Sequence, residues 1–402
     1  MATEQPSRRL ALLVALAGGG LLSTATTVGI TPFLLDIAHD FGTNLAAAGN
    51  LVAVQSVTWG VASLFAGAAS DRLGRRPLLV AGLLTLFVSG AAVAWSSSYA
   101  WMAVWRLVGG LGGGAFMGTV FATVSDHFPA AERGRSLGWV VTGQSLALVL
   151  GVPAMTLAGS VTGWRGAVLA HAITVLVCAG AVWVVVPRRS VRSTERPVSV
   201  RALARLVGPR VLALLFAGAT ERVCYAAVAV FLPTYLLTRY AIDAGQLALG
   251  LALVATGNLL GNLIGGQLSD RLRAPQLLLA FSLCAAGALA LPVLSWSPAV
   301  AVSIALGFMY TVVNATGRPA LLTVLSGVSN QARGAVLGLN ITFSSIGWLG
   351  ATALGGFVVG LADFPGLAVL TLGFGLLGAV LSLASHLAPR QSAPLLAART
   401  ER

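Results

Sequence analysis

Long apolar runs separated by short polar connections dominate the chain. Each run extends over about 20 residues, the length of helix needed to cross the hydrocarbon core of a bilayer. This alternation predicts an all-α integral membrane protein with twelve spans. We place the spans at residues 10–35, 44–69, 77–96, 100–125, 136–159, 166–186, 211–237, 246–268, 275–294, 299–324, 335–360 and 366–387.

One connection is longer than the others and divides the spans into two sets of six. It covers residues 187–210 and is polar and rich in arginine. We therefore predict a six-helix half at 1–186, a basic cytoplasmic linker at 187–210, and a second six-helix half with a short cytoplasmic tail at 211–402.

Two sequence patterns recur about half a chain apart. Two independent anchors at nearly the same offset indicate a duplicated six-helix unit. Such a repeat predicts two pseudosymmetric halves, with a substrate site between them near the middle of the membrane. The repeated pairs are Asp71-Arg72 with Asp270-Arg271, 199 residues apart (270 − 71), and Arg133-Gly134 with Arg333-Gly334, 200 residues apart (333 − 133).

The composition excludes a soluble globule. Of the 402 residues, 57% are hydrophobic and 9% are charged, whereas a soluble domain carries about 25% charged residues. The three cysteines, Cys178, Cys224 and Cys284, lie far apart within spans and indicate neither a disulfide framework nor a metal site. We expect no metal and no cofactor.

The net charge of +13 could suggest a nucleic-acid partner, but the arginines follow membrane topology instead. All 25 basic residues are arginine, and 20 of them lie in cytoplasmic segments if the N-terminus is inside. Only Arg165 and Arg239 then lie outside. Basic residues near membrane ends are retained in the cytoplasm, so we predict cytoplasmic termini in a bacterial inner membrane and no nucleic-acid binding.

A charged turn joins the second and third spans and resembles the loop signature of the major facilitator superfamily. The resemblance implies that Asp71 faces the start of span eleven and helps to close the cytoplasmic side. The copy at Asp270 and Arg271 has Arg273 where the first has glycine, which predicts a weaker contact. The residues of the first copy are Gly67, Asp71, Arg72, Gly74, Arg75 and Arg76.

Span five resembles the antiporter motif of drug–proton exporters. Pro153 removes a backbone hydrogen bond and permits a kink, and the glycines would let the helix slide across the seam between the halves. Met155 departs from the motif, which weakens the case for export. The motif residues are Gly143, Gly151, Pro153 and Gly159, followed by Gly163-Trp164-Arg165.

Charged side chains inside spans mark candidate functional residues, because burying one costs at least ~2.5 kcal/mol. Arg106 resembles the span-four arginine that the family implicates in proton coupling, although it could instead reach the outer surface. Glu221 is either a proton carrier, a counter-charge for a cationic substrate, or part of a structural ion pair near the inner surface, and it need not pair with its neighbour Arg222. Asp36 is either a loop acid or a proton-attracting group at the cavity mouth.

Several polar side chains could line the substrate cavity. Asn258 and Asn262 lie one turn apart on a glycine-rich face, where they either join helices or donate to substrate. Asn314 and Arg318 share a face of span ten. The cavity candidates are Arg222, Asn258, Asn262, Asn314 and Arg318.

The sequence contains no phosphate loop or nucleotide-binding domain, so we expect neither an enzyme nor an ATP-driven pump. The resemblance covers nearly the whole chain and is strongest to the twelve-span drug–proton antiporters of the arabinose-efflux-like group. It predicts a monomeric, proton-coupled exporter of a small organic molecule that works by alternating access. One alternative is a proton-coupled uptake symporter for an organic anion bound by Arg106, Arg222 and Arg318. Another is a non-transporting receptor on the same fold.

Overall fold

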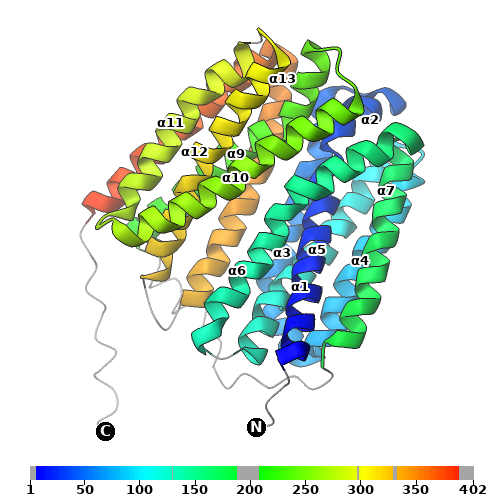
Figure 1. The fold of residues 1–402 in the computed structure, drawn as a ribbon, viewed down its shortest axis with the longest axis vertical. Helices are drawn as coiled ribbons and strands as arrows, with labels where there is room; N and C mark the ends of the chain where they lie inside the picture. Colours follow the sequence, from blue (N-terminus) through cyan, green and yellow to red (C-terminus); the bar gives the residue numbers. More distant parts are fainter. Residues whose placement is uncertain (1–5, 129, 188–207, 297, 329–332, 389–402) are drawn as a thin grey trace.

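The computed structural model describes residues 6–128, 130–187, 208–296, 298–328 and 333–388, and this part of the chain is helical with no strand (Figure 1). Most of the predicted linker and tail lies outside these residues, so the predicted domain boundaries stay predictions. Ten of the helical stretches described are long and apolar enough to cross a membrane.

In the described part of the first half there are seven α-helices and two short turns of other helix types. They are α1 (Pro6–Val28), the 3₁₀ turn η1 (Thr31–Phe33), α2 (Leu34–Asp40), α3 (Leu45–Leu73), α4 (Arg75–Ala94), α5 (Tyr99–His127), α6 (Ala130–Leu146), the π turn η2 (Ala147–Gly151) and α7 (Val152–Val185). The second half contains α9 (Pro209–Arg239), α10 (Ala244–Arg271), α11 (Pro275–Ser295), α12 (Val300–Ser326) and α13 (Arg333–Leu387).

Two helices, α7 and α13, fold back on themselves, which accounts for the difference between the ten stretches and the twelve predicted crossings. A straight helix as long as α13, with 55 residues, would extend about 80 Å, far more than the ~30 Å core of a bilayer. The backbone leaves the helical region at Gly163 in α7 (φ 70°) and at Asp363 in α13 (φ 55°). Each helix therefore forms two limbs, and the ten stretches make the twelve predicted crossings.

Ion pairs tie these two turns to the ends of neighbouring helices, with opposite order of charge in the two halves. In the first half, Arg165 after the turn of α7 pairs with Asp40 at the end of α2. In the second half, Asp363 in the turn of α13 pairs with Arg239 at the end of α9, at an N–O distance of 3.2 Å. The turns lie 200 residues apart (363 − 163), as the repeat predicts.

Replacing Asp363 with glycine is expected to stabilise the protein by about 1 kcal/mol. A non-glycine residue at positive φ with extended ψ stores about 1–3 kcal/mol of strain, whereas the exposed pair with Arg239 contributes about 0–1 kcal/mol. Thermal unfolding in detergent measures the change. The reciprocal Gly163→Asp variant should be destabilised. A lower melting temperature for Asp363→Gly would mean that the ion pair outweighs the strain.

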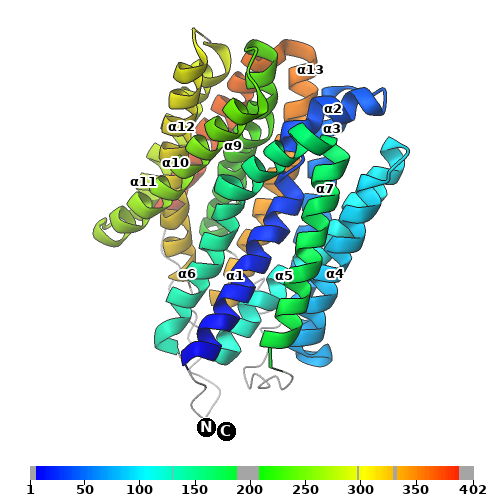
Figure 2. The same ribbon diagram turned by 45° about the vertical axis from the view of Figure 1, so that its right-hand side comes forward.

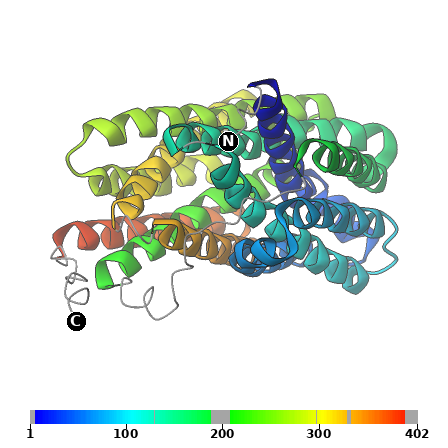
Figure 3. The same cartoon turned by 90° about the horizontal axis from the view of Figure 1, so that it is seen from below.

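The two halves lie side by side along the bundle (Figures 1 and 3). We call the end where α1 begins and α13 ends the terminal end. The opposite end, with α2 and the turns of α7 and α13, is the far end (Figures 1 and 2). Across the seam, α3 packs against α13 and α10 packs against α7.

At the far end, both halves contribute to one apolar core. Val28 of α1 and Leu51 of α3 belong to the same buried cluster as Phe231 and Leu236 of α9 and Ala351 of α13. The halves also approach each other closely between α3 and α9. A side chain on Gly49 of α3 would lie 3.2 Å from the ring of Phe231 of α9. The far end is therefore closed by apolar packing between the halves.

At the terminal end, each half has its own core. Leu16, Leu83 and Phe116 belong to a cluster made only of first-half residues. Leu214 and Leu283 belong to a cluster made only of second-half residues. The apolar cores of the two halves are thus joined at the far end and separate at the terminal end.

Candidate functional site

Glu221, Arg222 and Arg318 form a buried group that we call the ion cluster. Glu221 and Arg222 are in the middle of α9, and Arg318 lies 97 residues later on α12. On both helices the cluster falls between residues of the shared far-end core and residues of the terminal-end core of the second half, although Cys224 of the latter lies beyond Glu221 on α9. It therefore lies at the depth where the halves cease to share a core.

The carboxylate of Glu221 accepts hydrogen bonds from both arginines. Arg222 donates from Nε to Oε2 at 2.6 Å and from Nη2 to Oε1. Arg318 donates from Nη1 to Oε2 at 3.2 Å. Glu221 and Arg222 thus pair directly, which the roughly 100° angle between neighbouring helical side chains did not require. Of the three roles considered for Glu221 from the sequence, the structure shows the ion pair.

The ion cluster presents positive charge to its surroundings. Two arginines and one carboxylate give a formal charge of +1. The Glu221 side chain is 0% exposed, whereas Arg222 is 12% and Arg318 is 23% exposed. A molecule entering between the halves would therefore meet guanidinium groups before the carboxylate, so Glu221 is poorly placed as a direct counter-charge for a cationic substrate.

Aromatic and polar side chains surround the ion cluster. The guanidinium of Arg222 lies 4.8 Å from the centre of the Tyr225 ring, which packs edge-on against Trp348 of α13. Tyr310 of α12 donates to the Cys224 carbonyl at 2.6 Å. Asn314, one turn before Arg318, is fully buried and has no partner for its amide nitrogen or oxygen among the residues described.

Arg106 occupies a second buried site, in the first half. It is 2% exposed and does not reach the surface, so the snorkelling alternative is wrong. Its guanidinium donates to the carbonyls of Thr26 (2.7 Å), Thr27 (2.8 Å) and Leu51 (3.1 Å). The last carbonyls of a helix lack intrahelical partners, and α1 ends at Val28. Arg106 therefore caps the broken end of α1, where a bilayer provides no water.

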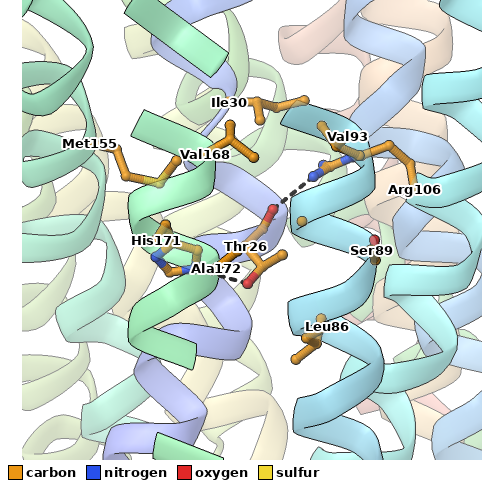
Figure 4. A pocket seen from close by; sticks show the side chains of 11 residues that line it. Thr26, Ile30, Leu86, Ser89, Val93, Arg106, Met155, Val168, His171 and Ala172 are labelled. Atoms are coloured by element: carbon orange, nitrogen blue, oxygen red, sulfur yellow. Dashed lines mark hydrogen bonds between the residues drawn. The ribbon is translucent and has the colours of Figure 1, made fainter. Parts of the chain in front are cut away.

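A small cavity lies beside Arg106 (Figure 4). His171 from the second limb of α7 faces it and lies 2.9 Å from the hydroxyl of Thr26. The cavity offers about 10 Å³ to the centre of a water molecule, which is room for about one water. It is too small for an organic substrate, and a proton-coupling role for Arg106 remains a prediction.

The charged turn after α3 is held by an ion network at the terminal end. Arg75 is 4% exposed and contacts Asp71 at 2.6 Å and Asp126 of α5 at 2.7 Å. It also donates to Ser70 and to the Gly67 carbonyl. Sequence reasoning missed Asp126, because its partner lies 51 residues away.

The other residues of this turn lie at its surface. Asp71 and Arg72 are exposed, Gly74 ends α3 with a φ of 96°, and the guanidinium of Arg76 lies 4.1 Å from the Trp183 ring centre. The helices α3 and α13 run antiparallel, since Gly60 faces Ser345 whereas Ala46 faces Gly356. Their terminal ends therefore lie together, and the gating role of Asp71 stays a prediction.

The glycines of the span-five motif face α1 and η1, not the seam between the halves. A side chain on Gly143 would overlap the Ala17 carbonyl, one on Gly159 would overlap the Phe33 ring, and one on Gly151 would lie 3.0 Å from the Ala25 Cβ. The expectation that they slide across the seam is wrong, because these small residues are used for close packing within one half. The π turn η2 ends at Gly151, two residues before Pro153, which has no backbone N–H to donate.

The remaining candidates lie away from the ion cluster or at the surface. The Asn262 amide donates to Asn258 on its own helix, at 2.9 Å to the carbonyl and 3.1 Å to the side chain. Asp36 is exposed on α2 at the far end, and Asp270 and Arg271 are exposed at the terminal end of α10. Of the predicted proton-coupling and cavity residues, Glu221 contacts Arg222 and Arg318, and Asn262 contacts Asn258. Among the predicted gating residues, Arg75 contacts Asp71 and Gly67.

Comparison with known proteins agrees with this architecture. The chain is 28% identical over 366 residues to a chloramphenicol resistance protein of Streptomyces lividans, covering 88% of each chain. Its fold matches that of a bacterial homologue of the human lysosomal transporter Spinster, in an inward-facing and occupied conformation. The TM-score is 0.80 and the identity is 16%, over 95% of this chain and 98% of the other.

The fold also matches the crystal structure of a D-xylose–proton symporter. The TM-score is 0.77 and the identity is 17%, with 94% of this chain and 97% of the other covered. The family model described as Major Facilitator Superfamily matches residues 16–352. This chain therefore belongs to the major facilitator superfamily and is a multi-pass membrane transporter rather than an enzyme.

Proposed function

We propose that this transporter is a proton-coupled exporter of a small organic molecule and works by alternating access. The observation that carries the proposal is the ion cluster, in which one fully buried carboxylate holds two arginines from different helices at the depth where the halves separate. Intramembrane acids in transporters commonly serve as proton carriers. Similarity to a resistance protein over 88% of the chain supports export.

Proton binding would dismantle the ion cluster. Ionised Glu221 holds both guanidinium groups in place through three hydrogen bonds. Protonation removes its charge and with it the attraction that links α9 to α12. A substrate that binds the two positioned guanidinium groups requires the ionised carboxylate, so proton and substrate exclude one another. Mutual exclusion at one site is the requirement for exchange.

The proposed orientation places the substrate entrance in the cytoplasm. With cytoplasmic termini, as the arginine distribution predicts, the divided terminal end faces inward and the shared core closes the outside. Substrate would load from the cytoplasm of a bacterial cell. Rocking of the halves would then expose the ion cluster outside, where a proton binds Glu221 and releases the substrate.

Uptake by proton symport is the second candidate, favoured by the charge of the ion cluster. Protonation raises the formal charge from +1 to +2, which would strengthen binding of an anion instead of preventing it. Proton and substrate would then travel together. The two candidates predict opposite effects of pH on substrate affinity. An exporter should bind its substrate more weakly as the pH falls, whereas a symporter should bind it more tightly.

Replacing Glu221 with glutamine is expected to abolish proton-driven transport. The test uses everted vesicles with an acidic interior and a panel of cationic, neutral and anionic compounds. Dissipation of the pH gradient on addition of a compound identifies exchange and the substrate class. In the Glu221→Gln variant the same compound should leave the gradient intact, because no carboxylate remains to carry the proton.

Asp363→Asn provides the matched control, because Asp363 is also paired with an arginine but is exposed at the far end. This variant should exchange as the wild type does. Proton-driven transport that survives Glu221→Gln would disprove the assignment of Glu221. Accumulation of the compound in right-side-out vesicles with an acidic exterior would show that the protein is a proton symporter and not an exporter.

A further inference from the structure

The ion cluster has spare hydrogen-bond donors in addition to its excess positive charge. Arg222 uses Nε and Nη2 to bind Glu221, and Arg318 uses Nη1. A guanidinium group carries five N–H donors. Nη1 of Arg222 and both Nε and Nη2 of Arg318 are therefore left over from the contacts with Glu221. Planar donors of this kind match the two oxygens of a carboxylate.

The excess charge favours an anion over a neutral or cationic ligand. Removing a charge from water is costly unless it is paired, and one of the two arginines lacks an acidic partner of its own. A monoanion would bring the formal charge of the site from +1 to zero. A cation would instead meet two guanidinium groups that shield a carboxylate with 0% exposure.

Asn314 supplies independent evidence for a polar ligand. Its side chain is fully buried and lies on the face of α12 that carries Arg318, one turn away. Neither its amide nitrogen nor its amide oxygen has a partner within the described part of the chain. Buried amides in folded proteins nearly always have a partner, so this one is available to a ligand bound beside Arg318.

Aromatic rings form the wall next to the arginines. Tyr225 lies beneath the Arg222 guanidinium, and Trp348 meets the Tyr225 ring at 6.0 Å with the planes 81° apart. Tyr225 is buried whereas Trp348 is half-buried, so Trp348 retains surface for a ligand. Perpendicular aromatic walls suit a flat apolar body.

From these observations we infer that the ion cluster binds a small organic carboxylate with a flat apolar body. The carboxylate contacts Arg222 and Arg318, the amide of Asn314 contacts a polar atom of the ligand, and the body packs against Trp348. The inference rests on the proposed function, because it names the class of molecule that the proposed site carries.

Ligand-dependent melting of the purified protein in detergent tests the inference without any gradient or transport. The probes are benzoate, its neutral isostere benzamide, and benzylamine. Benzoate should raise the melting temperature in a saturable manner, and the other two should not. Arg318→Gln and Arg222→Gln should each weaken benzoate binding about tenfold, the effect of losing a hydrogen bond to a charged group. Each variant leaves Glu221 paired with one arginine.

Two further variants separate a binding role from a structural one. Asn314→Ala leaves every charge in place and should weaken benzoate binding about fivefold. Arg239→Gln removes an exposed arginine that is ion-paired at the same 3.2 Å distance, and it should bind benzoate as the wild type does.

The inference fails if benzoate and a second flat carboxylate, cinnamate, both leave the melting temperature unchanged. It also fails if benzamide or benzylamine binds as tightly as benzoate, or if the two arginine variants bind benzoate normally. These outcomes differ from failure of the proposed function. If benzoate binding depends on the arginines but no proton movement accompanies transport, the inferred substrate class is supported and the proposed proton coupling is disproved.

Discussion

Replacing Arg106 with lysine is expected to destabilise the folded protein by about 3 kcal/mol. Arg106 donates to three carbonyls from two helices at once, those of Thr26, Thr27 and Leu51. An ammonium group carries its donors on a single atom and does not span this arrangement. At least two buried acceptors then lose their partner, each costing about 1–3 kcal/mol. Thermal unfolding in detergent measures the loss.

Arg239→Lys is the matched control, because Arg239 contacts an exposed carboxylate at the far end and should tolerate lysine. The experiment also separates two roles of Arg106. A variant that melts early has lost the cap on α1. A variant that melts normally but no longer couples protons would support the coupling role predicted from sequence and would contradict the structural one.

Replacing Glu221 with glutamine is expected to cost stability as well as coupling, by about 3 kcal/mol. The change leaves Arg222 and Arg318 side by side without a counter-charge, and removal of one partner from a buried ion pair costs about 3–5 kcal/mol. The lower end of that range applies because both guanidinium groups are partly exposed. Unfolding by denaturant, followed by tryptophan fluorescence, reports the change.

The double variant Glu221→Gln/Arg318→Gln tests whether charge is the cause. Its formal charge returns to +1, so it should recover part of the lost stability while proton coupling stays absent. If the single variant unfolds like the wild type, the three side chains contribute no net electrostatic stabilisation. If the double variant is less stable than the single one, packing of the Arg318 side chain matters more than its charge.

The twelve crossings could be predicted because lipid demands long apolar helices, and their boundaries agree with the structure within a few residues at most ends. The largest difference is at span one, where α1 ends at Val28, seven residues before the predicted 35 (35 − 28). The next largest is at span five. Its helix begins at Ala130, six residues before the predicted 136 (136 − 130), because polar residues continue the helix beyond its apolar part. Apolar content thus locates the membrane-crossing part of a helix better than its polar ends.

The candidate site was only partly predictable. Buried charges stand out in an apolar span, so Arg106, Glu221 and Arg318 could be identified from their residue types. Their partners could not, since Arg318 reaches Glu221 from 97 residues away. Arg106 binds backbone carbonyls, which every residue has and which leave no trace in a sequence.

The inverted order of charge at the far end bears on how the two halves diverged after duplication. A single substitution cannot convert one order of charge into the other, because it leaves two like charges or an unpaired charge. Asp40–Arg165 and Arg239–Asp363 therefore differ in both members of the pair. The turns are no longer interchangeable: grafting the Asp363 turn into the first half would set it against Asp40, so a chimaera must carry its partner helix end with it.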